Sequence, residues 1–224
     1  MDRTYRGTRY ACYVGSTTQA ICNNLTPLLF IIFQKDFALS YERLGSLVFL
    51  NFVTQLAVDL LCARYAHRIG YRVPLVLANA LSALGLILLG ILPLWMQDPY
   101  VGLCIAVFAY AVGGGLLEVL VSPVVDSLPT PQSAKGASMA LLHSFYCWGQ
   151  LAVVLISTLL LLVFGQRLWW VLPLLWAIVP ACNTVAFSRV PLMPMIPETQ
   201  RTKIRILFSS SIFLGFLQIG RAHV

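Results

Sequence analysis

The chain carries six apolar runs, each about as long as a bilayer is thick, and short linkers join them. A membrane-spanning helix needs about 20 mostly apolar residues, and lipid offers no partner for exposed backbone polar groups. Of the 224 residues, 59% are hydrophobic and 10% are charged, which excludes a soluble domain held by one anchor. We therefore predict an all-α membrane protein. The six runs cover residues 10–33, 44–65, 73–96, 101–128, 137–164 and 168–187.

The distribution of Lys and Arg predicts the orientation of these helices. If the N-terminus is inside, the inner segments hold 11 basic residues, whereas the outer loops hold 3, namely Lys35, Arg43 and Arg167. An excess of this kind on the cytoplasmic side is the positive-inside signal. We expect a multi-pass protein of the cell membrane with a cytoplasmic N-terminus. The net charge of +7 follows from these loop residues, so we expect no nucleic acid partner.

The sequence divides into three expected segments. Residues 1–188 form a six-helix transmembrane bundle, and residues 189–205, with three prolines and four basic residues, form a cytoplasmic linker. Residues 206–224 resemble the truncated start of a seventh helix, so we expect the chain to be a fragment. Residues 219–224 match one reading frame of a common sequencing adapter and are candidates for foreign sequence, with a natural short tail as the alternative. A basic linker after six helices is the expected join between two six-helix halves.

Glu118 lies inside the fourth apolar run and is the one acid expected well within a span. Inserting a carboxyl group there costs about 2.5–3.5 kcal/mol, and such residues usually face a bundle interior or a wet cavity. The glycines at 113–115 would let neighbouring helices approach, and Pro123 would interrupt the backbone hydrogen bonds. We expect Glu118 to exchange a proton or to contact a solute. A structural acid bonded to a neighbouring helix is the alternative.

One face of the first predicted helix and one face of the fifth are polar, at the spacing of an α-helix. Their amides, phenol and imidazole offer donors and acceptors suited to hydroxyl-rich solutes. Hydrogen bonding between helices, worth about 0.6 kcal/mol on average in membranes, is the alternative interpretation. The predicted substrate-binding residues are Gln19, Asn23 and Asn24 in the first helix and His143, Tyr146 and Gln150 in the fifth.

The second predicted helix carries an acid near its end, and basic residues follow it. Asp59 shares a helix face with Asn51 and Gln55, and Arg64 and Arg68 lie just beyond it. An acid at a helix end can form a charge latch with such cations at the inner membrane surface. We predict this conformational latch for Asp59, Arg64 and Arg68. Topology determination by the arginines alone is the alternative.

The six cysteines show no sign of a disulfide framework or a metal site. They form no C-x-x-C pair, and most of them lie inside apolar runs. Small polarisable side chains in such positions usually serve helix packing. We expect neither a metal nor any other cofactor.

The acid at Asp59 and the basic residues from Arg64 to Arg72 resemble the second-to-third loop signature of the major facilitator superfamily. Six helices, a basic linker and a seventh helix also resemble the first part of that superfamily's layout. The resemblance implies the N-terminal six-helix bundle of the major facilitator fold, built from two inverted three-helix repeats, 10–96 and 101–187. It further implies a solute site near the membrane midplane. A C-terminal half that is missing from this chain would complete that site.

Within the superfamily, the chain is similar to the fucose permease-like sugar–proton symporters. The stretches that carry this similarity are Asn-Asn-Leu at 23–25, the segment 115–123, and the segment 143–149, which begins His-Ser-Phe. The similarity implies that Glu118 is a proton or sugar site and that Asn24 and His143 face the sugar. Pro27 stands where the family has an aspartate. Proton coupling in this chain would therefore depend more heavily on Glu118.

We predict a secondary active transporter, not an enzyme, that moves a small polar solute by alternating access. The expected solute is a sugar and the expected coupling ion is a proton. A membrane-integral enzyme is one alternative, because residues 136–138, Gly-Ala-Ser, are similar to the serine loop of an intramembrane protease. Ser138 and His143 lie five residues apart on one helix and point in different directions, which disfavours this alternative. A structural half-carrier that moves no solute is the other alternative.

Overall fold

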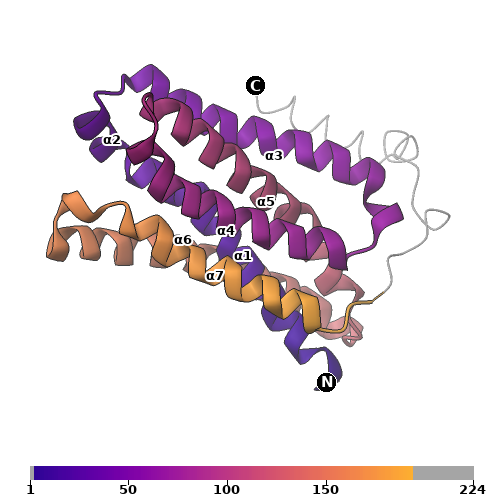
Figure 1. The fold of residues 1–224 in the computed structure, drawn as a ribbon. Coiled ribbons are helices and arrows are strands. Elements are labelled where there is room, and N and C mark those ends of the chain that lie inside the picture. Colours follow the sequence, from indigo (N-terminus) through magenta and orange to yellow (C-terminus); the bar gives the residue numbers. More distant parts are fainter. Residues whose placement is uncertain (1–2, 194–224) are drawn as a thin grey trace, which may run out of the picture. The chain divides into compact units, whose positions relative to one another are not determined.

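The computed structural model describes residues 3–193, and every regular element in that range is helical (Figure 1). The predicted linker from residue 194 onward and the predicted seventh-helix start at 206–224 lie outside the described residues. Three sets of side chains within the range are also not described, those of Arg3, of residues 63–69 and of Gln132.

Seven α-helices and two short 3₁₀ turns make up the described range. Together α1 and α2 cover the first apolar run, and α3–α7 cover the other five, which confirms the predicted all-α membrane fold. The predicted repeats correspond to α1–α4 and α5–α7. The helices are α1 (Arg6–Leu28), α2 (Phe30–Phe37), α3 (Tyr41–Ile69), α4 (Arg72–Trp95), α5 (Pro99–Ser127), α6 (Gln132–Phe164) and α7 (Val171–Arg189), and the turns are η1 (Arg3–Tyr5) and η2 (Gln166–Leu168).

Five of the described helices, α3 to α7, are long and apolar enough to cross a membrane. The first helix, α1, spans 23 residues but carries Gln19, Asn23 and Asn24 among its apolar side chains. These amides lower its mean hydropathy. A long helix of mixed polarity suits a place inside a bundle, where neighbouring helices and not lipid meet its polar face.

A break near Pro27 separates α1 from α2. Proline has no backbone N–H, so the last turn of α1 lacks one helical hydrogen bond. The Leu29 N–H instead donates to the Thr26 carbonyl at 3.1 Å, which tightens the turn before α2 begins. Ala38 then ends α2 in the left-handed region, at φ 51°.

The three consecutive glycines of α5 let two other helices pack closely against it. A Cβ on Gly113 would collide with Ser82 and with the backbone of α4. A Cβ on Gly115 would lie 3.1 Å from the Gln55 Cα of α3. Small residues allow such close backbone approach in membranes, where packing and not the hydrophobic effect holds helices together. Helix α5, which carries Glu118 one turn further along, is therefore held against both α3 and α4.

Buried side-chain hydrogen bonds add a polar tie between α1, α4 and α7. The Asn183 amide of α7 donates to the Asn79 side-chain oxygen at 3.0 Å and to the Ala11 carbonyl at 3.1 Å. The Asn79 amide in turn donates to the Leu75 carbonyl of its own helix at 2.8 Å. Every polar atom of this cluster that lies in the apolar interior thus has a partner, as burial requires.

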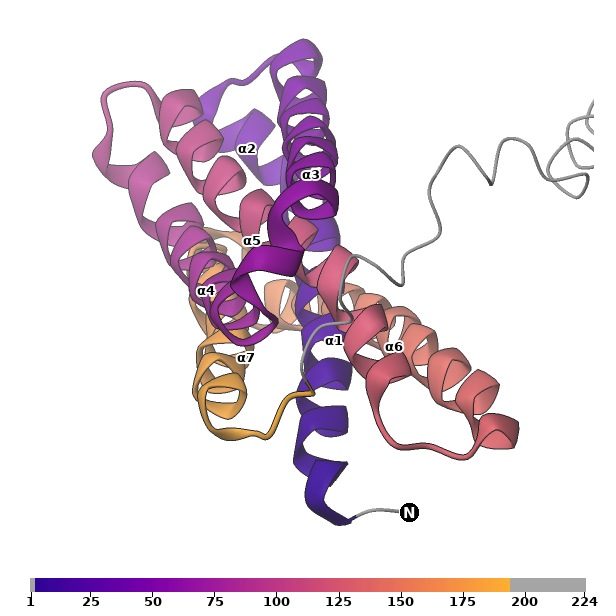
Figure 2. The ribbon, with the colours of Figure 1, turned by 90° about the vertical axis from the view of Figure 1, so that its right-hand side faces the viewer.

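Helix α6 is the least enclosed of the described spans. Of its most apolar stretch 17% is buried, compared with 56% for α5. It packs mainly along α1, where a Cβ on Gly149 would lie 3.0 Å from the Thr17 Cα. Figure 2 shows the first turns of α6 diverging from α1, which the helix crosses further along. A cavity lies between the two helices at that end.

Candidate functional site

Helices α1, α3, α5 and α6 together line an open cavity of about 430 Å³, hereafter the polar cavity. Each of the four helices contributes polar side chains to it. Those side chains are Ser16, Gln19 and Asn23 from α1, Gln55 and Asp59 from α3, Glu118 and Ser122 from α5, and His143 and Tyr146 from α6. The apolar lining is Phe52, Leu56, Leu117, Val121 and Leu142.

Asn23 is the centre of a hydrogen-bond network at one side of the polar cavity. Its side-chain oxygen accepts from Gln55 Nε2 at 2.7 Å and from Asn51 Nδ2 at 3.2 Å. Its amide nitrogen donates to the Tyr146 hydroxyl at 3.4 Å. One side chain of α1 therefore links α3 to α6, and the free lone pairs and hydrogens of these groups remain available to a solute.

Asp59 and Glu118 both place a carboxyl group in the polar cavity, so a second acid accompanies Glu118 there. The two groups interact electrostatically, and the Gln19 amide also interacts with Glu118. The sequence pattern ends the second run at residue 65, but α3 continues to Ile69. Asp59 therefore lies about 15 Å from the helix end, at 1.5 Å per residue.

One oxygen of the Asp59 carboxyl lacks a hydrogen-bond donor within the described part of the chain. This oxygen, Oδ1, is buried and finds no hydrogen-bond partner among the described side chains, which leave out those of residues 63–69. Leaving a buried acceptor of this kind unpaired is costly, and more so if it is charged. Protonation of the pair or a donor from a bound solute would remove that cost.

The structure brings most of the predicted site residues together. Gln19, Asn23, His143 and Tyr146 line the polar cavity beside Glu118. Two other predicted residues do not line it. The Asn24 amide donates to the Ala20 carbonyl of its own helix at 2.8 Å, and Gln150 is exposed one turn beyond Tyr146 on the same face of α6.

The predicted latch is described in part. Asp59 faces the polar cavity, whereas the side chains of Arg64 and Arg68 are outside the described residues. The latch therefore stays a prediction. The buried amides Asn51 and Gln55 are site residues that the prediction did not include, although their four-residue spacing with Asp59 on α3 was the signal that could have included them.

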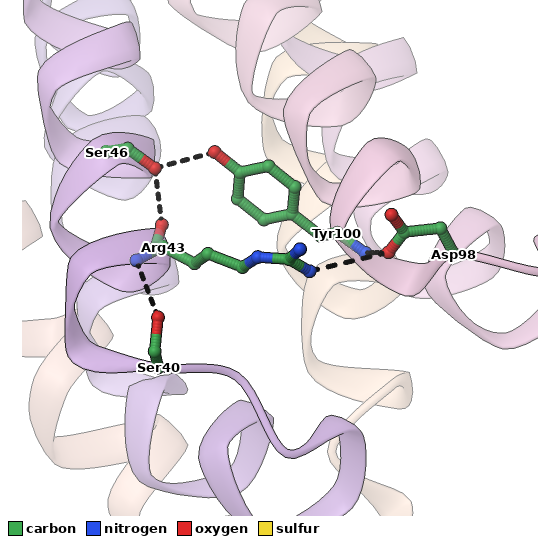
Figure 3. A network of polar contacts seen from close by, with 5 residues as sticks. All are labelled: Ser40, Arg43, Ser46, Asp98 and Tyr100. Atoms are coloured by element: carbon green, nitrogen blue, oxygen red, sulfur yellow. Dashed lines mark hydrogen bonds and ion pairs between the residues drawn. The ribbon is translucent and has the colours of Figure 1, made fainter.

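A second polar cluster joins α3 to α5 at the opposite end of the bundle from the N-terminus (Figure 3). The Arg43 guanidinium lies 4.0 Å from the Asp98 carboxylate and 5.0 Å from the centre of the Tyr100 ring. The Ser46 hydroxyl donates to the Arg43 carbonyl at 2.7 Å, so the Tyr100 hydroxyl donates to Ser46 across 2.6 Å. The charged pair is half exposed and contributes little stability alone. The cluster connects the two helices that carry Asp59 and Glu118.

Ser138 and His143 do not form a nucleophile and base pair. The Ser138 hydroxyl donates to the Ala134 carbonyl of α6 at 3.1 Å and lines a different cavity. His143 lines the polar cavity. A serine hydrolase needs these two groups within hydrogen-bonding reach, so this pair gives no support to the protease alternative.

Comparison with known proteins identifies the architecture. Residues 12–223 match the family model described as Major Facilitator Superfamily. Two crystal structures of a POT family transporter, one in complex with a thioalcohol conjugated peptide and one with 5-aminolevulinic acid, are similar at a TM-score of 0.66 and 16% identity. The match covers 96% of this chain and 46% of each transporter, so the chain spans about half their length. At this identity the likeness shows the fold alone. No curated protein matches the chain.

Proposed function

The chain belongs to the Major Facilitator Superfamily, and from this premise we propose that it is the N-terminal half of a secondary active transporter. The transporter would move a small polar solute across the cell membrane by alternating access. The observation that carries the proposal is the polar cavity, where four helices gather amides, a phenol, an imidazole and two carboxyls in a membrane-spanning bundle. Polar groups at such depth are costly and usually mark a solute or ion pathway.

A sugar is the solute class that the neutral side chains favour. Gln19, Asn23 and Tyr146 present both donors and acceptors, which matches the hydroxyl groups of a sugar. The similarity of residues 115–123 and 143–149 to fucose permease-like symporters supports the same class. A C-terminal half would supply the opposite wall of the cavity.

A proton is the coupling ion that the carboxyl pair favours. Closing the cavity around an ionised Asp59 or Glu118 removes a charge from water, which costs free energy. Closing it around the protonated pair does not incur that cost. Protonation would therefore shift the equilibrium between open and occluded states, which is the differential effect that coupling requires.

The orientation follows from the basic residues. The N-terminal segment, the α3–α4 connection and the end of α7 carry the excess of Lys and Arg, so these parts would face the cytoplasm. Residues 189–205 would then form a cytoplasmic linker to the second half.

An amine-bearing solute is a second candidate, supported by the unpaired Asp59 oxygen. An ammonium group could donate to Asp59 and Glu118 together and would satisfy both carboxylates. The similar POT family structures hold a thioalcohol conjugated peptide and 5-aminolevulinic acid, which shows what those proteins bind.

Uptake by the full-length gene product in proteoliposomes tests the proposal. We expect an inward proton gradient to drive accumulation of a labelled sugar, and unlabelled sugars to compete with it. Competition by amines but not by sugars would favour the second candidate. If neither sugars nor amine-bearing solutes accumulate under an imposed proton gradient, proton-coupled transport of both solute classes is contradicted.

A further inference from the structure

A second cavity, of about 850 Å³, lies where α1 and α6 diverge at their N-terminal ends. We call it the basic cavity, defined by Arg6, Arg9, Tyr10 and Tyr13 of α1, by residues 129–131, and by the facing residues of α6 from Ala134 to Phe145. It shares no lining residue with the polar cavity. The stacked rings of Tyr13 and Phe145, 4.6 Å apart, close it toward the α1–α6 contact.

The charge of the basic cavity is positive and uncompensated. Its described lining holds two arginines and no acid. Among the described residues, Arg6 contacts the Tyr10 side chain, through a 3.4 Å hydrogen bond and through the face of the ring. Arg9 donates one hydrogen bond, to Thr130 at 3.3 Å, and its buried Nε finds no partner among residues 3–193. An anion between the two guanidiniums would accept hydrogen bonds from their accessible N–H groups.

Apart from Thr130 and Ser138, the rest of the basic cavity is lined by apolar and aromatic side chains, and it leads onto the open face of α6. Ala134 and Ala137 are small and leave room beside Tyr10. Leu141 begins a stripe that continues at seven-residue intervals through exposed Trp148, Leu155 and Leu162. The stripe is about 31 Å long at 1.5 Å per residue, which matches the hydrocarbon core of a bilayer.

We propose that the basic cavity binds an anionic phospholipid of the leaflet at this end of the bundle. The phosphate would lie between Arg6 and Arg9, and one acyl chain would pass Ala137 and continue along the Leu141 stripe. Basic pockets between membrane helices recognise anionic headgroups in this way. Charge complementarity at one end and apolar complementarity along α6 distinguish this occupant from a soluble phosphate, which would use the arginines alone.

Lipid retention by the purified 224-residue chain tests the headgroup contact. In native mass spectrometry, phosphatidylglycerol should bind more tightly than phosphatidylcholine. Each arginine near the surface contributes about a fivefold change in affinity, so the double variant Arg6→Gln/Arg9→Gln should bind phosphatidylglycerol about 25-fold more weakly. Arg189→Gln, which replaces an exposed arginine outside the basic cavity, is the control and should weaken binding by no more than about fivefold, the effect of one surface charge. If the double variant retains phosphatidylglycerol as well as Arg189→Gln does, the proposal is overturned.

Photo-crosslinking identifies the occupant of the basic cavity. It keeps both arginines, so its result does not depend on whether the double variant folds. A benzophenone amino acid in place of Leu141 should capture phosphatidylglycerol in excess of its share in mixed vesicles, and Ala137→Trp should abolish that excess. The same probe in place of exposed Phe49 on α3 should capture lipids in proportion to the bulk. Capture of a protein segment, or loss of binding with inorganic phosphate as competitor, would overturn the lipid assignment.

Discussion

The polar cavity and the basic cavity share two helices, α1 and α6, yet their chemistry is opposite. On α1, residues 6–13 face the basic cavity with two arginines and two tyrosines, whereas residues 16–23 face the polar cavity with a serine and two amides. Long arginine side chains near a helix end can reach water or headgroups, so placing their charge there costs little free energy. The carboxyls of Asp59 and Glu118 instead line a cavity between four helices, where acids are uncommon and therefore informative about function. The surroundings of a charged residue thus decide whether it indicates transport or contact with the membrane surface.

The largest expected effect comes from disrupting the contact between α4 and α5, which should abolish binding to the polar cavity but not to the basic cavity. Gly113→Leu would drive a side chain into the α4 backbone and push α5 away from its position beside α3. Overpacking of this kind costs about 3 kcal/mol of folding stability, the upper end of its usual range. Thermal unfolding in detergent should show the loss. Solute binding should disappear, whereas phosphatidylglycerol binding, which depends on α1 and α6, should persist in the molecules that remain folded. Loss of both together would mean that the cavities are not independent.

The next effect compares two adjacent amides of α1. Asn23→Ala would remove the oxygen that accepts hydrogen bonds from Gln55 and Asn51. Each buried donor left unpaired costs about 1–3 kcal/mol of desolvation free energy. Asn24→Ala removes one bond to the carbonyl of its own helix and should change solute affinity less than threefold. Isothermal titration with the transported solute measures both. Equal effects of the two substitutions would contradict the assignment of Asn23 as the centre of the network.

The smallest effect concerns the cluster in Figure 3. Arg43→Gln removes a half-exposed ion pair and a ring contact between α3 and α5. Exposed pairs contribute about 0.2–1 kcal/mol, so the melting temperature should fall only slightly. Solute and lipid affinities should both stay within twofold. A large loss of solute binding would show that this cluster controls the spacing of Asp59 and Glu118 more strongly than its exposure indicates.

Much of the fold follows from the sequence, because apolar runs of bilayer length leave the backbone no alternative to helices. The same holds for the residues of the polar cavity on α1 and α6, whose stripes at helical spacing predict Gln19, Asn23, His143 and Tyr146. The meeting of Asp59 with Glu118 in one cavity could not be predicted, because it depends on how α3 packs against α5. In the sequence, Arg6 and Arg9 indicate only the orientation of the first helix. The cavity beside them depends on the divergence of α6 from α1, which the sequence does not show.

The central claim is that the Asp59–Glu118 pair couples protons to solute movement, and the pH dependence of uptake tests it most directly. The measurement is gradient-driven uptake and gradient-free exchange of the labelled solute by the full-length protein, compared with Glu118→Gln and Asp59→Asn. We predict that each variant loses gradient-driven accumulation by at least about tenfold, equivalent to 1.4 kcal/mol, while it retains exchange that no longer varies with pH. Full gradient-driven accumulation in both variants would contradict the account.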